Sequence, residues 1–237
     1  MTRAAVQPAA STVLESTTST GVHWRMGEPV GLGAFGTEAT PTGPRPPAAL
    51  AEELRRARAT ARDWVRDLVT SRLGQHWAGF EETPAGRKPR PRGLPGVDVS
   101  ISHSGRTLLV AVVHGGRLGV DVEDEPFDAF DHPSLVRRMC TASERDRVES
   151  LPAPSRRRAL AQAWTAKEAA LKAMGAGLAI DPRRIVVPGV LASGRGSGPE
   201  RSIVHLTAGE AHVLRPGAPG DDETPSVWRG FHVDWSG

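Results

Sequence analysis

Apolar residues recur every three to four positions between residues 47 and 73, directly after a pair of prolines. This spacing is typical of one helix face, and Gly74 suits the position after a helix end. The sequence therefore predicts a helix from Pro47 to Leu73. Its apolar face consists of Leu50, Leu54, Ala57, Ala61, Trp64, Val65 and Leu68, and the same helix carries Arg55, Arg56, Arg58, Arg62 and Arg66.

A second helix is predicted from near Ser155 to Gly175, and its charges are unusually placed. At helical spacing, one apolar stripe consists of Leu160, Trp164, Leu171 and Met174. Lys167 falls in the middle of this stripe, with Glu168 and Lys172 on its border. An unpaired buried charge costs several kcal/mol, so we expect opposite charge, a metal or a ligand nearby. For Lys167 an acidic side chain and a phosphate are both open.

Strands are predicted where apolar and polar residues alternate or where short apolar runs occur. They cover residues 22–26, 97–101, 107–113, 118–125, 184–187, 203–206 and 227–235. Thr141 and Glu144 have the spacing of a capping box, which predicts a short helix to about Ser150. Residues 1–20 are rich in Ala, Ser and Thr without a period, and we expect a flexible tail there.

Two short segments could contact a ligand. Ser102–Gly105, SHSG, forms a polar break between two predicted strands, which suits a ligand but equally a turn stabilised by serine hydroxyls. Gly31–Gly36, GLGAFG, matches the letters of a dinucleotide-binding loop. Prolines follow it where that motif needs a helix, which favours a simple connector.

Asp121 and Glu123 occupy one face of the predicted strand at 118–125, opposite Val120 and Val122. Two carboxylates about 6 to 7 Å apart on a strand repel each other unless positive charge lies between them. A hard divalent cation such as Mg²⁺ would supply that charge. The alternative is a solvated strand face or a charged strand edge.

Charge and cysteine content narrow the classes of protein. The formal net charge is +3, and much of the positive charge is arginine in clusters, which favours an anionic partner. We find no nucleic-acid-binding module and no apolar run near the roughly 18 residues of a membrane span. The N-terminus lacks an apolar signal region, and the lone Cys140 suits a reducing compartment, so we expect a cytoplasmic location.

With these elements in order, the chain resembles the surfactin-synthetase-activating class of 4′-phosphopantetheinyl transferases. That family is marked by a G-[IV]-D-[IV]-E strand and, about forty residues later, by a W-[ST]-x-K-E-[AS]-x-x-K helix. Here these are Gly119–Glu123, GVDVE, and Trp164–Lys172, WTAKEAALK. The family's K-P element resembles Lys88-Pro89, and its S-x-S-H-S strand end resembles Ser100–Ser104. The resemblance covers about residues 86–178.

The resemblance implies an α/β (α+β) fold of two similar halves related by a pseudo-twofold axis, each a small sheet packed with helices, with the active site at their junction. The halves would cover residues 21–117 and 118–237, following the tail at 1–20, and the chain would act as a monomer. The Mg²⁺ and transfer site would belong to the C-terminal half.

The resemblance also implies site residues. Asp121, Glu123 and Glu168 would hold Mg²⁺, or Mn²⁺ as an alternative, on the pyrophosphate of coenzyme A, and Lys172 would contact a phosphate. The catalytic set would be Asp121, Glu168 and Lys172, with Glu168 as a candidate base. Metal ligation and base duty change the pKa of one carboxylate in opposite directions. The coenzyme A site would comprise Arg62, Lys88, Pro89, Ser102, His103, Lys167 and Lys172.

The implied activity is Mg²⁺-dependent transfer of 4′-phosphopantetheine from coenzyme A to a serine of an apo acyl or peptidyl carrier protein, releasing adenosine 3′,5′-bisphosphate. Such carriers serve polyketide, nonribosomal peptide and fatty acid biosynthesis, and the arginines at residues 137–158 would suit an acidic carrier. The alternatives are a metal-dependent hydrolase of a nucleotide pyrophosphate and a non-catalytic binder of a phosphorylated ligand or acidic protein. No nucleic acid or membrane partner is expected.

Overall fold

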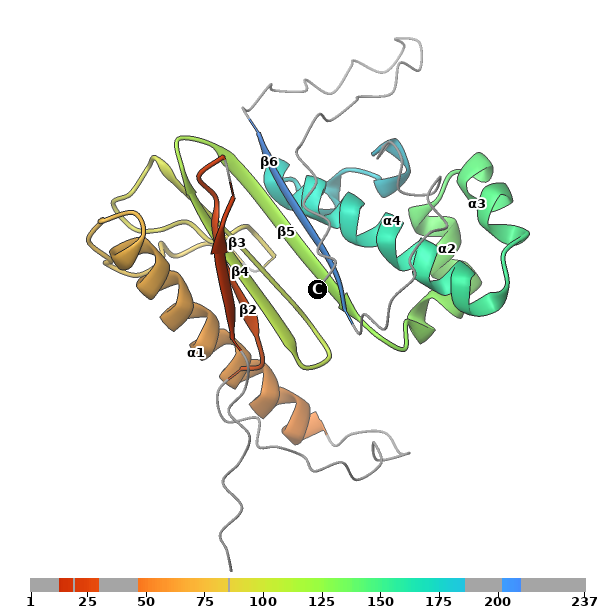
Figure 1. Cartoon of the computed structure of the whole chain (residues 1–237), viewed down its shortest axis with the longest axis horizontal. Helices are drawn as coiled ribbons and strands as arrows, with labels where there is room; N and C mark the ends of the chain where they lie inside the picture. Colours follow the sequence, from red (N-terminus) through yellow and green to blue (C-terminus); the bar gives the residue numbers. More distant parts are fainter. Residues whose placement is uncertain (1–12, 19, 30–46, 85, 186–201, 210–237) are drawn as a thin grey trace, which may run out of the picture.

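The structure of the chain is a computed structural model that describes residues 13–18, 20–29, 47–84 and 86–185, and the backbone of residues 202–209. Figure 1 shows the layers: α1 (Pro47–Ser71) covers one face of a sheet, and β5 (Arg117–Asp124) with β6 (Ser202–Gly209) lies between that sheet and α4 (Ala153–Met174). The helices α2 (Pro133–Met139) and α3 (Ala142–Glu149) lie at the far end. This is a mixed α/β fold, as predicted.

The four-stranded sheet is antiparallel, in the order β1-β2-β4-β3. Its strands are β1 (Leu14–Thr17), β2 (His23–Gly27), β3 (Val97–Ser104) and β4 (Thr107–His114). Side chains alternate between the two faces of β4, so each face has its own core. One core packs Trp64 and Leu68 of α1 on Val110, and the other packs Leu109 and Ala111 on β5.

Side chains of β3, rather than a backbone ladder, bind one edge of β5. The amide N–H of Leu118 donates to Asp98 Oδ2 at 2.7 Å, and that of Val120 donates to Ser100 Oγ at 3.0 Å. Farther along, the N–H of Asp124 donates to Ser104 Oγ at 3.2 Å. The other edge of β5 pairs antiparallel with β6. Alternate residues of β3 therefore satisfy backbone donors of β5 and hold it against the sheet.

The predicted polar break at residues 102–105 is wrong in its extent. Ser102, His103 and Ser104 lie within β3, and the turn consists of Gly105 and Arg106 alone. The pattern of hydroxyls does not interrupt the strand, because Ser102 and Ser104 face β5 and find hydrogen-bond partners there.

Gly119 brings β5 and α4 into direct backbone contact. A Cβ atom at this position would lie 1.8 Å from the carbonyl oxygen of Ala169 and 2.6 Å from the amide nitrogen of Ala173. Glycine therefore allows an approach that no other residue permits. The helix consequently lies directly over the strand face that carries Asp121.

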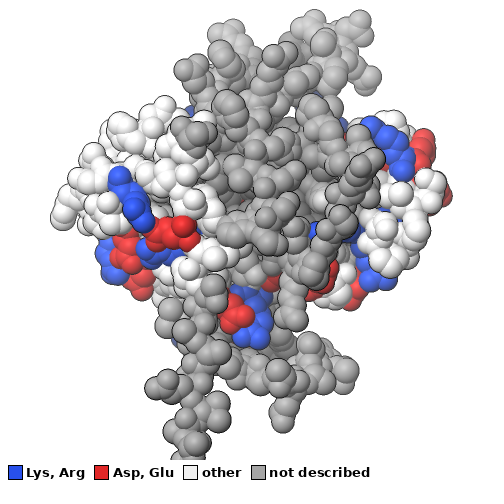
Figure 2. Space-filling model, viewed as in Figure 1, with Lys and Arg blue, Asp and Glu red and all other residues white. Residues whose placement is uncertain are grey.

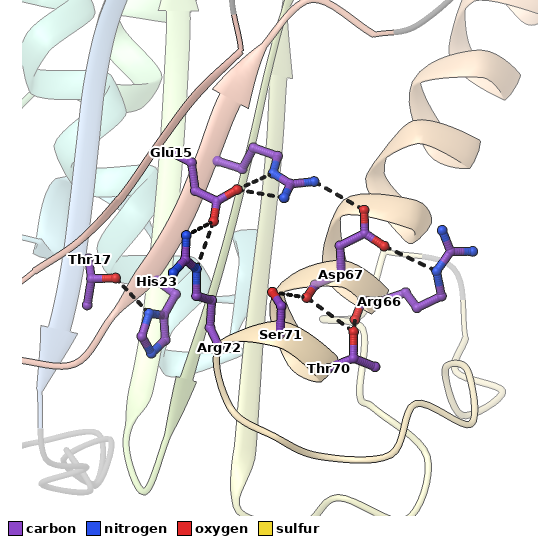
Figure 3. A network of polar contacts seen from close by, with 9 residues as sticks. Glu15, Thr17, His23, Arg66, Asp67, Thr70, Ser71 and Arg72 are labelled. Carbon is purple, nitrogen blue, oxygen red and sulfur yellow. Dashed lines mark hydrogen bonds and ion pairs between the residues drawn. The ribbon is translucent and has the colours of Figure 1, made fainter.

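Residues 14–17, expected to belong to a flexible tail, instead form β1. Glu15 binds Arg25 of β2 at 2.6 Å and Arg72 at 2.6 Å, just beyond α1, and Arg25 also contacts Asp67 at 3.3 Å (Figure 3). These ion pairs connect β1, β2 and the end of α1. The prediction failed because β1 is held by its hairpin pairing with β2 and by the ion pair with Arg72, which the composition of residues 1–20 does not show.

The remaining predicted elements have mixed outcomes. The helix at 47–73, the strands at 97–101, 107–113, 118–125 and 203–206, and the capping box of α3 are confirmed. The strand at 184–187 is wrong where the structure describes it, since Arg184 ends the 3-10 helix η3 (Pro182–Arg184) and Ile185 lies outside any strand. Residues 31–36 and 227–235 lie outside the described residues. The pseudo-twofold axis and the boundary near residue 117 remain predictions.

Across the described part of the chain, no helix is long and apolar enough to cross a membrane.

Candidate functional site

The buried carboxylate of Asp121 is the centre of a polar cluster where β3, β5 and α4 meet. Its Oδ1 atom accepts hydrogen bonds from Ser102 Oγ at 2.6 Å and from Lys172 Nζ at 2.6 Å. Lys172 Nζ also donates to Ser102 Oγ at 2.9 Å, which closes a triangle. Only 5% of Asp121 is exposed, and its Oδ2 atom has no hydrogen-bond partner among the described residues.

The three carboxylates named from sequence form one electrostatic group. Burial raises the pKa of Asp121, while the Lys172 ammonium and the Ser102 hydroxyl oppose that rise. Burial and then the charge of Asp121 raise the pKa of both Glu123 and Glu168. Ser104 Oγ donates to Glu123 Oε2 at 2.9 Å and stabilises its ionised form. Negative charge therefore accumulates here beyond what Lys172 neutralises.

This group fits a hard divalent cation by its chemistry. All the candidate ligand atoms are carboxylate oxygens, which hard divalent cations prefer. Asp121 Oδ2 is buried and accepts no hydrogen bond from the described residues. The three side chains are not gathered into a cage, since no set of three His, Cys, Asp or Glu residues is close enough to hold a metal within the described ranges. For a cation to bind here, Asp121 would be the ligand already in place, and Glu123 and Glu168 would have to turn toward it.

Lys172 does not form a surface ion pair with Glu168, although their spacing of four residues allows one. Its Nζ instead reaches Asp121 and Ser102. Burial of Asp121 makes this contact far less screened than an exposed helical pair, which contributes only about 0.3 to 0.5 kcal/mol.

His103 of β3 lies near the positive charges of Lys172 on α4 and Arg58 on α1. It is partly exposed on β3, and partial burial lowers its pKa, followed by the nearby charges of Lys172 and Arg58. Because these cations surround it, His103 is neutral near pH 7 and lies in a field that attracts anions.

Arg62 and Pro89 line a hollow of about 530 Å³ between α1 and the segment that follows it. Trp77 and Phe80, packed edge to face with ring centroids 4.9 Å apart, form an aromatic wall there. The hollow therefore combines aromatic surface with a guanidinium group.

Lys88 does not face that hollow. Its Nζ contacts Asp98 Oδ2 and donates to the carbonyl oxygen of Leu118 at 2.5 Å, and burial lowers its pKa. Lys88 thus ties the segment that precedes β3 to the beginnings of β3 and β5. Its place in the coenzyme A site stays a prediction.

Lys167 also lies away from Asp121. Its side chain is 1% exposed, and Nζ donates to Glu144 Oε2 at 2.8 Å and to the carbonyl oxygen of Met139 at 2.8 Å. The partner left open by the sequence is therefore an acidic side chain of α3. The structure does not bring Lys167 to the coenzyme A residues.

The sequence analysis gave no individual role to two neighbours of the carboxylates. Ser104 holds Glu123, and the charge of Arg138 on α2 opposes the rise in the pKa of Glu168 that burial causes. The signal for Ser104 was present in the alternation of Asp98, Ser100, Ser102 and Ser104 along one face of β3. Nothing in the sequence distinguishes Arg138 from its neighbouring arginines.

Comparison with known proteins identifies one family. Residues 117–194 match the model of the 4′-phosphopantetheinyl transferase superfamily. The chain is 28% identical over 135 residues to the 4′-phosphopantetheinyl transferase HetI of Nostoc sp., covering 56% of each protein. It is 34% identical over 82 residues to slr0495 of Synechocystis sp., to which the same name is provisionally given, covering 33% of this chain and 32% of that one. The alignments thus span about half or less of these relatives.

Proposed function

Since residues 117–194 carry the signature of the 4′-phosphopantetheinyl transferase superfamily, we propose that the protein transfers 4′-phosphopantetheine from coenzyme A to a serine of an apo carrier protein. The superfamily agrees with the sequence prediction, whereas the surfactin-type subclass stays a prediction. One observation supports the activity most strongly. The Asp121 carboxylate binds the Lys172 ammonium through Oδ1 at 2.6 Å, while its Oδ2 atom has no partner among the described residues, so an oxygen available to a metal and a cation available to a phosphate belong to one contact.

In this proposal the carrier serine oxygen attacks the β-phosphorus of coenzyme A. The bond from that phosphorus to its bridging oxygen breaks, and adenosine 3′,5′-bisphosphate leaves with the electron pair. Lys172 neutralises negative charge on the phosphates, as phosphoryl transfer mainly requires positioning and charge neutralisation. Glu168 accepts the serine proton, directly or through a water molecule, and its raised pKa makes it a stronger base.

Asp121, Glu123 and Glu168 would hold Mg²⁺, with Mn²⁺ as the alternative. When bound, such an ion polarises the pyrophosphate and stabilises charge on the leaving oxygen. Ser102 and Ser104 keep two of these carboxylates in place through their hydroxyls. His103 and Arg62, with Pro89, would contact the adenosine part of coenzyme A.

A cation bound by Asp121, Glu123 and Glu168 should make the free energy of unfolding depend on both the Mg²⁺ concentration and the pH. Without metal, the raised pKa values mean that the folded state holds protons more tightly than the unfolded state. The contribution of these groups to stability therefore falls as pH rises through their folded pKa values. Because Mg²⁺ binds the deprotonated carboxylates, its stabilising effect should be larger near pH 8 than near pH 5.5.

Thermal melts of the full chain with and without MgCl₂ at both pH values measure this. At about 100 times the Kd, Mg²⁺ should add about 2.7 kcal/mol at the higher pH. Asp121→Asn should show a much smaller shift. An equal Mg²⁺ effect at both pH values, or none, would contradict the metal assignment.

An acidic carrier would dock on those arginines that form no ion pair with the described residues. Among the arginines at residues 137–158, Arg157 forms an ion pair with Asp128 at 2.9 Å and Arg158 with Glu125 at 3.6 Å. Arg137 and Arg138 make no hydrogen bond or ion pair with described residues. They line a hollow of about 420 Å³ together with Asp181, Pro182 and Arg183. Figure 2 shows basic side chains, interspersed with acidic ones, at the end of the molecule where α2 and α3 lie.

The double variant Arg137→Glu with Arg138→Glu should raise the KM for an acidic apo carrier at least tenfold. Opposed charges steer and orient association, so reversing them weakens docking, while the KM for coenzyme A should change little. Steady-state transfer kinetics measure both constants. Arg147→Glu, an exposed change on α3, is the matched control. A double variant with the carrier KM of the wild type would exclude this docking surface.

Mass spectrometry of an apo carrier incubated with the protein, coenzyme A and Mg²⁺ tests the activity itself. The phosphopantetheine mass increment should appear on the carrier serine, and its absence would refute the proposal. A nucleotide pyrophosphate hydrolase would release adenosine 3′,5′-bisphosphate without a carrier. Coenzyme A binding that is independent of Mg²⁺, without carrier modification, would indicate a non-catalytic binder.

A further inference from the structure

Lys167 is a fully buried lysine that the proposed reaction does not use. Its Nζ atom lies 2.8 Å from both Glu144 Oε2 and the carbonyl oxygen of Met139. Glu144 Oε2 also accepts from the backbone N–H of Thr141 at 2.8 Å, as part of the capping box of α3. One ammonium group thus joins the end of α2, the beginning of α3 and the middle of α4.

Stability alone does not account for a buried ion pair at this position. Replacing such a pair by apolar or neutral residues of similar volume is often neutral or stabilising, because burial costs both charges their hydration. Where a buried ion pair has a benefit, that benefit is therefore to favour one packing arrangement over others. Here the contact selects one arrangement of the α2–α3 corner, by which we mean residues 133–149, against α4.

The sequence neighbours of this contact belong to the proposed active site. Met139 directly follows Arg138, and Lys167 directly precedes Glu168. The hydrogen bond from Lys167 Nζ to the carbonyl oxygen of Met139 at 2.8 Å places the last turn of α2, with Arg138, beside the part of α4 that carries Glu168. The Lys167 side chain therefore links the α4 backbone next to Glu168 to the α2 backbone next to Arg138.

We propose that Lys167 and Glu144 are positioning residues, which hold the α2–α3 corner and its Arg137–Arg138 hollow in register with Glu168 on α4. The catalytic consequence rests on the proposed transfer activity, whereas the structural consequence does not. Loss of the contact should loosen the corner without unfolding the chain.

Cys140 reports on that corner directly. It is the single cysteine of the chain, it follows Met139, and it is fully buried, with burial raising the pKa of its thiol to about 11. A thiol reagent at neutral pH can reach it only when the corner opens. The rate of Cys140 labelling therefore measures opening without any assumption about activity.

The test compares the wild type with the double variant Lys167→Met and Glu144→Gln. Gln can keep the capping box of α3, and Met fills the volume of the lysine stem, so the double variant should remain folded. We expect Cys140 to be labelled by a chromogenic disulfide reagent at least tenfold faster. We also expect kcat for carrier modification to fall at least tenfold, with the KM for coenzyme A unchanged.

Two further variants complete the experiment. Glu144→Gln alone retains an acceptor oxygen for Lys167 and should give intermediate labelling and transfer rates, which keeps the test decisive if the double variant unfolds. Arg55→Met with Glu52→Gln removes an exposed ion pair on α1 and should change neither rate. A folded double variant with the labelling rate and kcat of the wild type would overturn the proposal. If the wild type modifies no carrier, the transfer activity fails while the labelling rates still decide the role of the pair.

Discussion

Gly119→Ala should destabilise the protein by about 3 kcal/mol or more, which corresponds to a fall in Tm of about 6 to 12 °C for a chain of this size. The added Cβ would overlap the Ala169 carbonyl oxygen at 1.8 Å. Both sides of this contact are backbone, so no side chain can rotate away and β5 must separate from α4. Urea or thermal unfolding measures the loss.

Gly96→Ala is the matched control for Gly119→Ala. Its added Cβ would lie 3.0 Å from the end of the His114 side chain, which can move, so we expect a loss below about 1 kcal/mol. Equal stability of the two alanine variants would show that the β5–α4 contact is not close. The expected difference also matters for function, because the same contact places Lys172 of α4 over Asp121 of β5.

Asp121→Asn should reduce phosphopantetheine transfer at least about a thousandfold while leaving the fold intact. The change removes the charge that holds the Lys172 ammonium and the oxygen proposed to ligate the metal. Stability should change by only about 1 kcal/mol, because burial already disfavours the charged form of Asp121 and Asn keeps an acceptor for the Ser102 hydroxyl. Lys172 is partly exposed and can turn toward water.

Carrier mass spectrometry and a thermal melt on the same preparation separate the two effects of Asp121→Asn. Asp124→Asn, on the same strand but oriented toward the β3–β4 turn, is the control and should retain transfer. Substantial turnover by Asp121→Asn at saturating Mg²⁺ would exclude both proposed roles of the carboxylate. A large loss of stability with normal turnover would make Asp121 a structural residue.

Local patterns predicted most elements that lie near the site. The helical period of 47–73 and 155–175 predicted α1 and α4, and alternation at 118–125 predicted β5 with Asp121 and Glu123 on one face. These predictions held because the two faces of an element carry different residue types, as in β5, where Val120 and Val122 join the sheet core and Asp121 contacts Lys172 of α4. The tail containing β1 was mispredicted because Glu15 finds Arg25 and Arg72 only after the chain folds.

The site itself was predictable as a set of residues but not as a set of contacts. Spacing and resemblance named Asp121, Glu168 and Lys172, whereas the contact of Lys172 with Asp121 depends on how α4 crosses β5 at Gly119. Lys88 and Lys167 were placed with the coenzyme A residues by motif. The structure gives them Asp98 and Glu144 as partners instead.

The sequence by itself determined the resemblance to a family, the main helices and strands, and the carboxylates available for chemistry, because these depend on residue type and on short-range period. Only the tertiary structure decided which of the three lysines lies beside Asp121. Each of the three lysines lies beside a carboxylate, although Lys172, unlike Lys88 and Lys167, is partly exposed. The distances between distant segments, set by the packing of α4 on β5 and of α3 on α4, selected the partner of each.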